Sequence, residues 1–237
     1  MAKIIGINPV YEAIKSGKEI EKLEIFKGIR KENIKEILRL ATVRNIKVIY
    51  KDKREDNNQG VSAIVSDYDD NYITLDELLE KELVKKYSTI VILDQVQDPR
   101  NFGAIIRSSE CFGVKGIIIQ DRNNAKLSET VYKTAAGALE YVDIVKVTNI
   151  SDTIDKLKKY GYFVYGSSSH LTTTLYDEVS YPEKVALVVG NEGNGMRKKV
   201  SEHCDMNVKI NLHGEINSLN VSVATGILLA EISKNRK

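Results

Sequence analysis

The chain has 237 residues, of which 42% are hydrophobic, and its 35 lysines and arginines nearly balance 33 aspartates and glutamates. This length and apolar content suffice for one large or two modest domains with ordinary cores. No apolar run reaches the roughly 18–20 residues that span a bilayer, and the N-terminus lacks the blocks of a secretory signal peptide. Since two cysteines also exclude a disulfide framework, we expect a soluble cytoplasmic protein.

Positive charge is concentrated at the start of the chain. Residues 1–54 carry 14 lysines and arginines against seven acids, and the stretch from residue 55 to 82 is strongly acidic. Such an excess on a nearly neutral protein is compatible with a phosphate-rich partner. A solvated lysine-rich surface would give the same composition, so both interpretations stay open.

The first 70 residues predict a small α/β unit. A helix is expected over residues 8–17, with Asn8 as its N-cap and Pro9 in its first turn. Apolar spacing predicts a second helix at 33–41 and strands at 23–26, 47–50 and 61–65. A turn-rich acidic stretch at 67–72 and a short helix at 75–83 follow, which places the domain boundary between residues 73 and 86.

Strands and helices alternate from residue 87 onward. Strands are predicted at 89–93, 116–119, 142–147, 162–165, 185–189 and 206–210. Helices are predicted at 103–112, 130–139, 150–160, near Lys198 and at 219–232. Apolar strands that alternate with helices are typical of a parallel sheet covered on both faces.

Two segments rich in Asn, Gly and Ser each follow a predicted strand. Residues 185–197 read VALVVGNEGNGMR, and residues 210–226 read INLHGEINSLNVSVATG. Polar turns after parallel strands are where α/β folds bind ligands, and Gly190, Gly193 and Gly195 let the backbone approach one closely. Their spacing, G-x-x-G-x-G, and the lack of an acid at the end of the next strand argue against a dinucleotide-binding loop.

Three further polar side chains are candidates for a functional role. Asn101 can cap the helix after the first buried strand, whose N-terminus attracts anionic oxygen. Arg107 is either a surface arginine or a functional cation. Glu192 is either a functional carboxylate or a partner for the dipole of the following turn.

The last helix also begins among polar residues. Asn217 or Ser218 can cap it, while Asn220 and Ser222 then sit in its first turn and need partners from the backbone or a ligand. The three histidines, at 170, 203 and 213, share no ligand spacing with one another or with the cysteines. We therefore expect no metal site.

The order of these motifs resembles a known family. Asn101 with Arg107, VGNEG at 189–193 and SLNVSVA at 218–224 are similar to the three motifs of the SpoU/TrmH family of RNA ribose 2′-O-methyltransferases, and the resemblance covers residues 87–237. TAAGALE at 134–140 resembles the RlmB-type subgroup, which methylates a guanosine of 23S rRNA. GINPVYEAI at 6–14 and QGVSA at 59–63 resemble that subgroup's small, ribosomal-protein-like substrate-binding domain.

The resemblance implies an architecture and a cofactor. Residues 1–72 would be the RNA substrate-binding domain, 73–86 a linker, and 87–237 a catalytic domain with a parallel sheet, helices on both faces and a C-terminal trefoil knot. S-Adenosylmethionine would bind the knot through the backbone at Gly190, Ile210 and Leu219. Such proteins are homodimers whose active sites combine both chains, with Asn101 and Arg107 facing the partner's knot.

The resemblance also implies the chemistry, which is methyl transfer to a ribose 2′-hydroxyl of rRNA, with a guanosine of 23S rRNA as the expected target. The expected catalytic residues are Asn101, Arg107, Glu192, Ser218 and Asn220. Because a guanidinium is hard to deprotonate, we interpret Arg107 as an electrostatic clamp rather than a base. The alternatives are the same chemistry on another rRNA nucleotide, including antibiotic-resistance methylation, on tRNA, or a non-catalytic RNA-binding factor.

Within the basic N-terminal segment, Lys27, Arg30 and Lys31 are our hypothesis for the RNA docking surface. Two positions near the motifs depart from what relatives commonly carry. Gln95 stands where glycine is frequent, and Ser109 stands where alanine is common.

Overall fold

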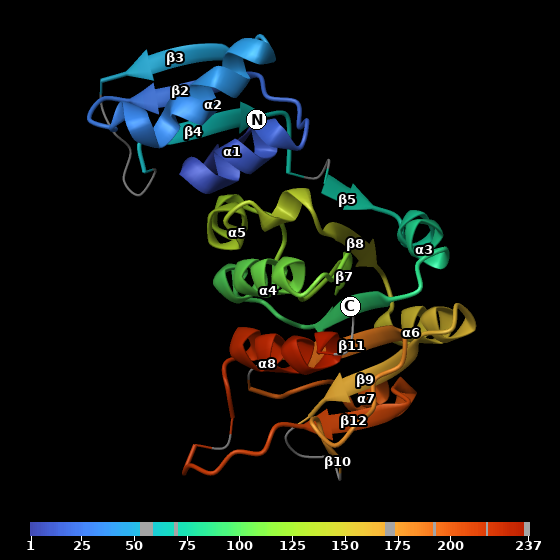
Figure 1. The fold of residues 1–237 in the computed structure, drawn as a ribbon. Helices are drawn as coiled ribbons and strands as arrows, with labels where there is room; N and C mark the ends of the chain where they lie inside the picture. The colour runs from blue at the N-terminus through green and yellow to red at the C-terminus, as the bar shows by residue number, and fades with distance from the viewer. Residues whose placement is uncertain (53–58, 69–70, 169–173, 192, 217, 235–237) are drawn as a thin grey trace. The chain divides into compact units, whose positions relative to one another are not determined.

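The computed structural model describes residues 1–52, 59–68, 71–168, 174–191, 193–216 and 218–234. They form two compact units (Figure 1), of which the first is Met1–Asn71 with Lys126–Tyr141 and the second is Tyr72–Ala125 with Val142–Lys237. The linear division into 1–72, 73–86 and 87–237 stays a prediction, to which the structure adds that residues 126–141 pack with the first unit. Across the described ranges, no helix is long and apolar enough to cross a membrane.

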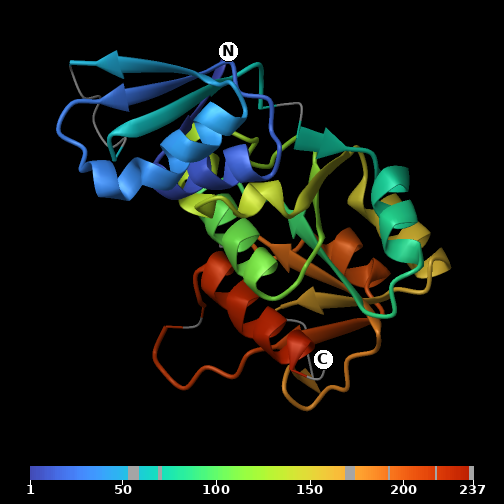
Figure 2. The ribbon, with the colours of Figure 1, turned by 45° about the horizontal axis from the view of Figure 1, so that its top comes forward.

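The first unit is built on a four-stranded sheet of order β1-β4-β2-β3. β1 (Ala2–Ile5) and β2 (Lys22–Phe26) run antiparallel to β4 (Val61–Val65), and β3 (Lys47–Lys51) pairs with β2 in parallel. Helices α1 (Ile7–Lys15) and α2 (Lys31–Val43) lie together on one face of this sheet (Figure 2). Each presents an apolar stripe at helical spacing to the core: Val10, Ala13, Ile14, Ile34, Ile37 and Ala41.

The start of α1 differs from the prediction. The helix begins at Ile7, and its N-cap is Gly6 rather than Asn8. Gly6 has a φ of 108°. A residue with a side chain would be strained in this conformation, so this turn requires glycine. The amide of Ile7 donates to Oε1 of Gln59 at 3.0 Å, so a side chain from a distant strand end replaces the local cap.

Residues 126–141 contribute α5 (Glu129–Ala135) and the 3₁₀ turn η2 (Ala138–Glu140) to the first unit. Helix α5 contacts β1 and α1. The buried ring of Tyr132 packs on Tyr68 with the ring centroids 5.1 Å apart, and Lys18 pairs with Glu140 at 3.4 Å. The TAAGALE motif thus belongs in space with the N-terminal residues.

The second unit contains an eight-stranded sheet of order β10-β12-β9-β11-β6-β7-β8-β5, in which every pair of neighbours is parallel. Its strands are β5 (Tyr72–Ile73), β6 (Ser88–Asp94), β7 (Gly116–Gln120), β8 (Asp143–Val147), β9 (Phe163–Ser167), β10 (Thr174–Leu175), β11 (Lys184–Gly190) and β12 (Met206–Lys209). The central strands are buried on both faces, as their continuous apolar sequences predict. The two-residue strands β5 and β10 were not predicted.

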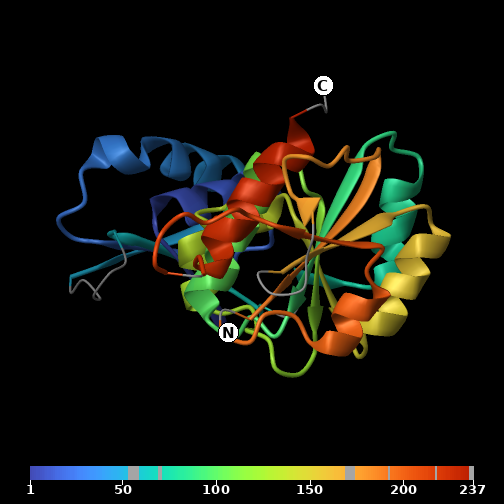
Figure 3. The same cartoon turned by 90° about the horizontal axis from the view of Figure 1, so that it is seen from below.

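Helices cover both faces of this sheet (Figure 3). On one face lie α3 (Leu75–Leu83), α6 (Ile150–Lys159) and α7 (Lys198–His203), and on the other lie α4 (Pro99–Cys111) and α8 (Val221–Ser233). Ile90 and Ile92 of β6 share a core with Leu78 of α3 and Ile154 of α6. The predicted α/β class, with a parallel sheet between helices and a small N-terminal α/β unit, is confirmed, while the trefoil knot stays a prediction.

Candidate functional site

A cavity of about 610 Å³ lies in the second unit, at the carboxyl ends of neighbouring parallel strands. Its walls come from the ends of β9 and β11, the segments after β11 and β12, and the starts of α7 and α8: Ser167, Ser168, Val189, Gly190, Asn191, Gly193, Asn194, Gly195, Met196, Ser201, Ile210, Leu212, Ser218, Leu219, Val221 and Ala224. None of these described lining side chains is ionisable. The cavity is therefore suited to holding a ligand by shape and backbone contacts, and not to acid–base chemistry of its own.

The glycine-rich segment after β11 folds back on itself over Gly190. Asn191 and Gly195 exchange backbone hydrogen bonds of 3.1 and 2.9 Å, and Gly195 has a φ of 65°. A Cβ on Gly190 would stand 2.2 Å from the carbonyl carbon of Gly195 and 2.2 Å from the amide nitrogen of Met196. Only glycine at 190 permits this approach, so the shape of the wall depends on that residue.

Four of the predicted site residues line this one cavity. They are the three expected to bind the cofactor through their backbone, Gly190, Ile210 and Leu219, together with Ser218. They come from three chain segments after two different strands, so only the parallel sheet brings them together. Their roles stay proposals.

Asn220, and not Ser218, caps the last helix, while Asn217 lies outside the described residues. Its Oδ1 accepts from the amides of Ser222 at 2.9 Å and Val223 at 3.4 Å. Its Nδ2 donates to Oδ1 of Asn101 at 3.0 Å. Two predicted catalytic residues, 119 positions apart, are thus in direct contact.

Helix α4 carries Asn101 and Arg107, and its cap also differs from the prediction. Asp98 is the N-cap and accepts from the amide of Arg100 at 2.7 Å, with Pro99 at the first helical position. Asn101 therefore lies inside the first turn, where its side chain is free to reach Asn220. The prediction of Asn101 as the cap was wrong because Asp98 and Pro99 together form the stronger start signal.

Arg107 is not brought to the Asn101–Asn220 pair. Six residues separate it from Asn101, which is roughly 240° around the helix axis at about 100° per residue. Its side chain is exposed and makes no hydrogen bond or ion pair with any residue that the structure describes. The guanidinium is available to an external anion.

The remaining predicted residues either do not line the cavity or fall outside the residues that the structure describes. Glu192 falls outside the described residues. Lys27, Arg30 and Lys31 are exposed between β2 and the first turn of α2 in the first unit. Lys27 pairs with Asp52, so one of the three charges is partly neutralised.

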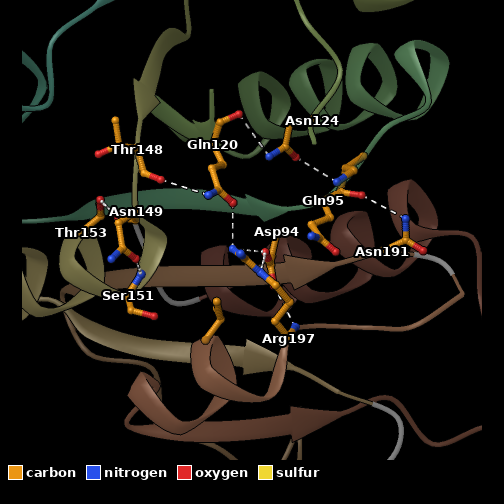
Figure 4. A network of polar contacts seen from close by, with 12 residues as sticks. Asp94, Gln95, Gln120, Asn124, Thr148, Asn149, Ser151, Thr153, Asn191 and Arg197 are labelled. Carbon is orange, nitrogen blue, oxygen red and sulfur yellow. Dashed lines mark hydrogen bonds and ion pairs between the residues drawn. The ribbon is translucent and has the colours of Figure 1, made fainter. Parts of the chain in front are cut away.

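Sequence reasoning missed a network of polar residues behind the glycine-rich segment (Figure 4). Asp94, the buried last residue of β6, binds Arg197 at the end of that segment, and Asn191 donates to the carbonyl of Gln95 at 3.0 Å. Gln95 has a φ of 65°, the left-handed conformation in which glycine is favoured, so the frequent glycine of relatives has a conformational reason. The available signal was an aspartate directly after the four apolar residues at 90–93 of a buried strand.

Cys204 lies near the cavity, in contact range of Gly166 and close to Met196. Burial raises the pKa of the Cys204 thiol to about 12. The thiol therefore stays protonated at neutral pH and is unsuited to nucleophilic or redox chemistry. In the part of the chain that the structure describes, no group of three or more His, Cys, Asp or Glu side chains could hold a metal ion.

Two family models match successive parts of the chain. Residues 88–230 match the SpoU rRNA Methylase family, and residues 3–70 match the RNA 2′-O ribose methyltransferase substrate-binding model. The chain is 38% identical over 240 residues to a protein of Staphylococcus epidermidis that is provisionally named a TrmH family tRNA/rRNA methyltransferase. That alignment covers 98% of this chain and 95% of the relative.

Solved structures share the fold. The SpoU methyltransferase AviRb from Streptomyces viridochromogenes superposes with a TM-score of 0.82 at 24% identity, over 99% of this chain and 89% of its own. An AdoMet-bound rRNA methyltransferase from Sinorhizobium meliloti gives a TM-score of 0.81 at 24% identity, over 100% of this chain and 88% of its own. With the family models and the curated relative, these findings show that the chain belongs to the SpoU/TrmH family of RNA methyltransferases.

Proposed function

We propose that this protein transfers a methyl group from S-adenosylmethionine to a ribose 2′-hydroxyl of RNA, with a guanosine of 23S rRNA as the target. The observation that carries the proposal is the cavity at Gly190, where residues from all three sequence motifs meet or adjoin. Ser218 and Leu219 line the cavity, and the next residue, Asn220, holds Asn101 at 3.0 Å. We propose that the protein acts in the cytoplasm.

The residues that line the cavity fit the methyl donor. Gly190, Ile210 and Leu219 would hold it through their backbone groups. Because Gly190 has no Cβ, its backbone stays close to that of Gly195 and Met196 in the cavity wall, in space that a side chain would occupy. S-Adenosylmethionine carries a positive sulfonium, and no lysine or arginine is among the described lining residues. Apolar walls such as Val189 and Leu212 suit its adenosine. The AdoMet-bound relative of the same fold supports this assignment.

When bound, the donor supplies an electrophilic methyl group, so the protein need only align a 2′-oxygen with it and manage one proton and one charge. We assign the alignment to Ser218, Asn220 and Asn101. Asn220 caps α8 and donates to Asn101 of α4, and Ser218 lies two residues before Asn220. Glu192 would position the nucleotide within the glycine-rich segment. Arg107, an unpaired exposed cation within the described residues, would stabilise charge on the 2′-oxygen or a neighbouring phosphate.

RNA docking is assigned to the first unit. Lys27, Arg30 and Lys31 are exposed at one end of its sheet, at the entrance to α2, and the substrate-binding model covers them. Replacing all three with alanine should weaken RNA binding and flatten its dependence on salt, because phosphate contacts release counterions. Unchanged binding and an unchanged salt slope would refute this surface.

The proposed active form is a homodimer. Ile216 is 77% exposed and Val223 of α8 is 51% exposed, and these apolar side chains precede or begin the helix that carries Asn220. Buried in a partner interface, they would no longer contact water. This supports an active site assembled near α8 from two chains.

The test is methyl transfer from labelled S-adenosylmethionine to 23S rRNA and bulk tRNA in parallel, with nucleoside analysis of the product. We expect 2′-O-methylguanosine in rRNA alone. Label in tRNA, which the relative's name also admits, would reassign the substrate. An Arg107→Ala variant tests whether the protein is an enzyme or only binds RNA. We expect the variant to bind RNA but to methylate nothing. Full methyl-transfer activity in the variant would overturn the role of Arg107.

A further inference from the structure

We propose that Asp94 and Arg197 are positioning residues that hold the glycine-rich segment 190–197 in the shape the methyl donor binds. Neither side chain lines the cavity, and neither was among the predicted site residues, although Arg197 ends the glycine-rich motif. The inference rests on the proposed function, since it takes the cavity at Gly190 as the donor site.

Asp94 accepts two hydrogen bonds from one residue and forms an ion pair with it. Its Oδ2 accepts from the backbone amide of Arg197 at 2.8 Å, its Oδ1 accepts from Nε at 2.8 Å, and Nη2 lies 2.7 Å from the same Oδ1. Asp94 is the last residue of β6, and its carboxylate is buried. A buried carboxylate requires charge compensation and hydrogen bonds, so this contact constrains both the side chain and the main chain of Arg197.

Arg197 extends the contact across the sheet (Figure 4). Its Nη2 donates to Oε1 of Gln120, the last residue of β7, at 2.9 Å. Gln120 in turn donates to the carbonyl of Thr148, which directly follows β8, at 3.0 Å. One guanidinium is therefore tied to the carboxyl ends of three neighbouring strands, which leaves it little freedom to move.

The start of the glycine-rich segment is held by Gln95, the residue that follows Asp94. Asn191 donates to the carbonyl of Gln95 at 3.0 Å, and its own Oδ1 accepts from the amide of Gly193 at 2.8 Å. The dipeptide Asp94–Gln95 thus holds positions 191 and 197, at the two ends of the segment. Gln95 adopts its left-handed φ of 65° at this junction, and strained backbone of this kind persists where surrounding contacts impose it.

The two sides of the ion pair should respond differently in stability but alike in donor binding. Arg197→Met leaves a buried carboxylate without its cation, whereas Asp94→Asn leaves an arginine side chain that is 38% exposed and can be hydrated. Arg197→Met should therefore lower the melting temperature more. Both changes release the same segment, so both should weaken donor binding.

The experiment measures S-adenosylmethionine binding by calorimetry in the full-length wild type and in Asp94→Asn, Arg197→Met and Arg197→Lys. We expect Kd to rise roughly tenfold to 100-fold in the first two variants, because losses of this size are typical at metal sites when residues that orient the binding groups are replaced. Arg197→Lys keeps the charge but loses the fork, so it should fall between the wild type and Arg197→Met.

Glu82→Gln is the matched control, because Glu82 is a buried carboxylate of α3 that bonds to the opposite end of β6 from Asp94. It is 2% exposed, pairs with Lys85 at 2.5 Å and accepts from Ser88, the first residue of β6, at 2.8 Å. Its loss should lower the melting temperature without changing Kd. An equal rise of Kd in Glu82→Gln would show that any buried defect has this effect, and would overturn the proposal.

Hydrogen exchange in the donor-free protein separates this inference from the proposed function. The amides of Gly193, Gly195 and Arg197 should exchange faster in Asp94→Asn and Arg197→Met than in the wild type. A wild type that does not bind S-adenosylmethionine would refute the proposed function and leave this test standing. Unchanged exchange and unchanged Kd in both variants would overturn the positioning role.

Discussion

The side chain of Asn220 joins two helices while it begins one of them. Its Oδ1 caps α8 through the amides of Ser222 and Val223, and its Nδ2 donates to Asn101 of α4 at 3.0 Å. The same two helices pack along one face of the parallel sheet. The cap of α8 and the geometry of a predicted catalytic pair therefore depend on one amide group.

Because the two roles use different atoms, Asn220→Asp should separate them. The carboxylate still accepts from the helix amides and suits the helix dipole, but it cannot donate to Oδ1 of Asn101, whose amide must turn over and donate instead. We expect stability close to that of the wild type with methyl transfer strongly reduced. Asn220→Ala should lose about 1 kcal/mol of stability as well as activity. Urea unfolding and a methyl-transfer assay on both variants give the comparison, and an active Asn220→Asp protein would contradict the catalytic role of the pair.

Gly190→Ala should damage the donor site while a neighbouring glycine tolerates the same change. The new Cβ would stand 2.2 Å from the backbone of Gly195 and of Met196, so the segment must open. At Gly193 the nearest atom to an added Cβ is Oδ1 of Asn191 at 3.5 Å, which is an ordinary contact. We expect donor binding to be lost in Gly190→Ala and retained in Gly193→Ala. Equal affinities in calorimetry would show that the fold of this segment does not shape the site.

Much of the regular structure could be predicted because it follows from local apolar spacing. The strand Val61–Val65 and the helix Leu75–Leu83 have the predicted bounds. The two-residue strands β5 and β10 could not be predicted, since two residues show no period. The cap of α1 could not be predicted because a distant side chain, Gln59, accepts from its first amide. The cap of α4 was mispredicted although Asp98 and Pro99 gave a local signal.

The candidate site was predictable only in part for the same reason. Gly190 and Leu219 stand in local motifs, and the sheet brings them to one cavity. The contact of Asp94 with Arg197 spans 103 positions and leaves no local pattern beyond an acid at a strand end. Whether such an aspartate forms an ion pair with a distant arginine depends on the order of the strands in the sheet. Composition and periodicity do not determine that order.

Ser109→Ala should stabilise the protein. The Ser109 hydroxyl is fully buried on α4 and has no hydrogen-bond partner among the described residues. Removing an unsatisfied buried group recovers its desolvation cost, so we expect a gain of roughly 1 kcal/mol in the free energy of unfolding. Ser88→Ala is the control, because that buried hydroxyl bonds to Glu82 and Tyr162 and its loss should destabilise. Urea unfolding curves of the two variants should shift in opposite directions, and a destabilised Ser109→Ala protein would contradict the prediction.

Acid should remove a stabilising contribution of Glu24 in the first unit. Burial by itself would raise the pKa of Glu24, but the hydrogen bond from Lys51 and the charge of Lys3 outweigh it, so the pKa is lowered from 4.5. A carboxyl whose folded pKa is depressed contributes stability above its unfolded pKa and loses it as pH falls through the folded value. The contribution is therefore complete above about pH 4.5 and declines below it.

Glu24→Gln tests this linkage. The variant should be less stable than the wild type near neutral pH, and the difference should shrink as pH falls below about 4.5. Glu21→Gln, at an exposed carboxylate of the same segment, is the control and should track the wild type. Unfolding free energies measured from pH 3 to 7 decide the matter, since a difference independent of pH would exclude the ionised contact as its cause.

Val223→Glu should convert the proposed dimer to monomers without unfolding the chain. Val223 is 51% exposed at the third position of α8, where a glutamate favours helix formation. Burying that charge in a partner interface would be costly, so association should weaken. Val84→Glu makes the same substitution at an 89% exposed valine after α3 and should leave the dimer intact. Sedimentation equilibrium of both variants locates the interface: a dimer that survives Val223→Glu but not Val84→Glu would move it away from α8, and a monomeric wild type would refute the dimer itself.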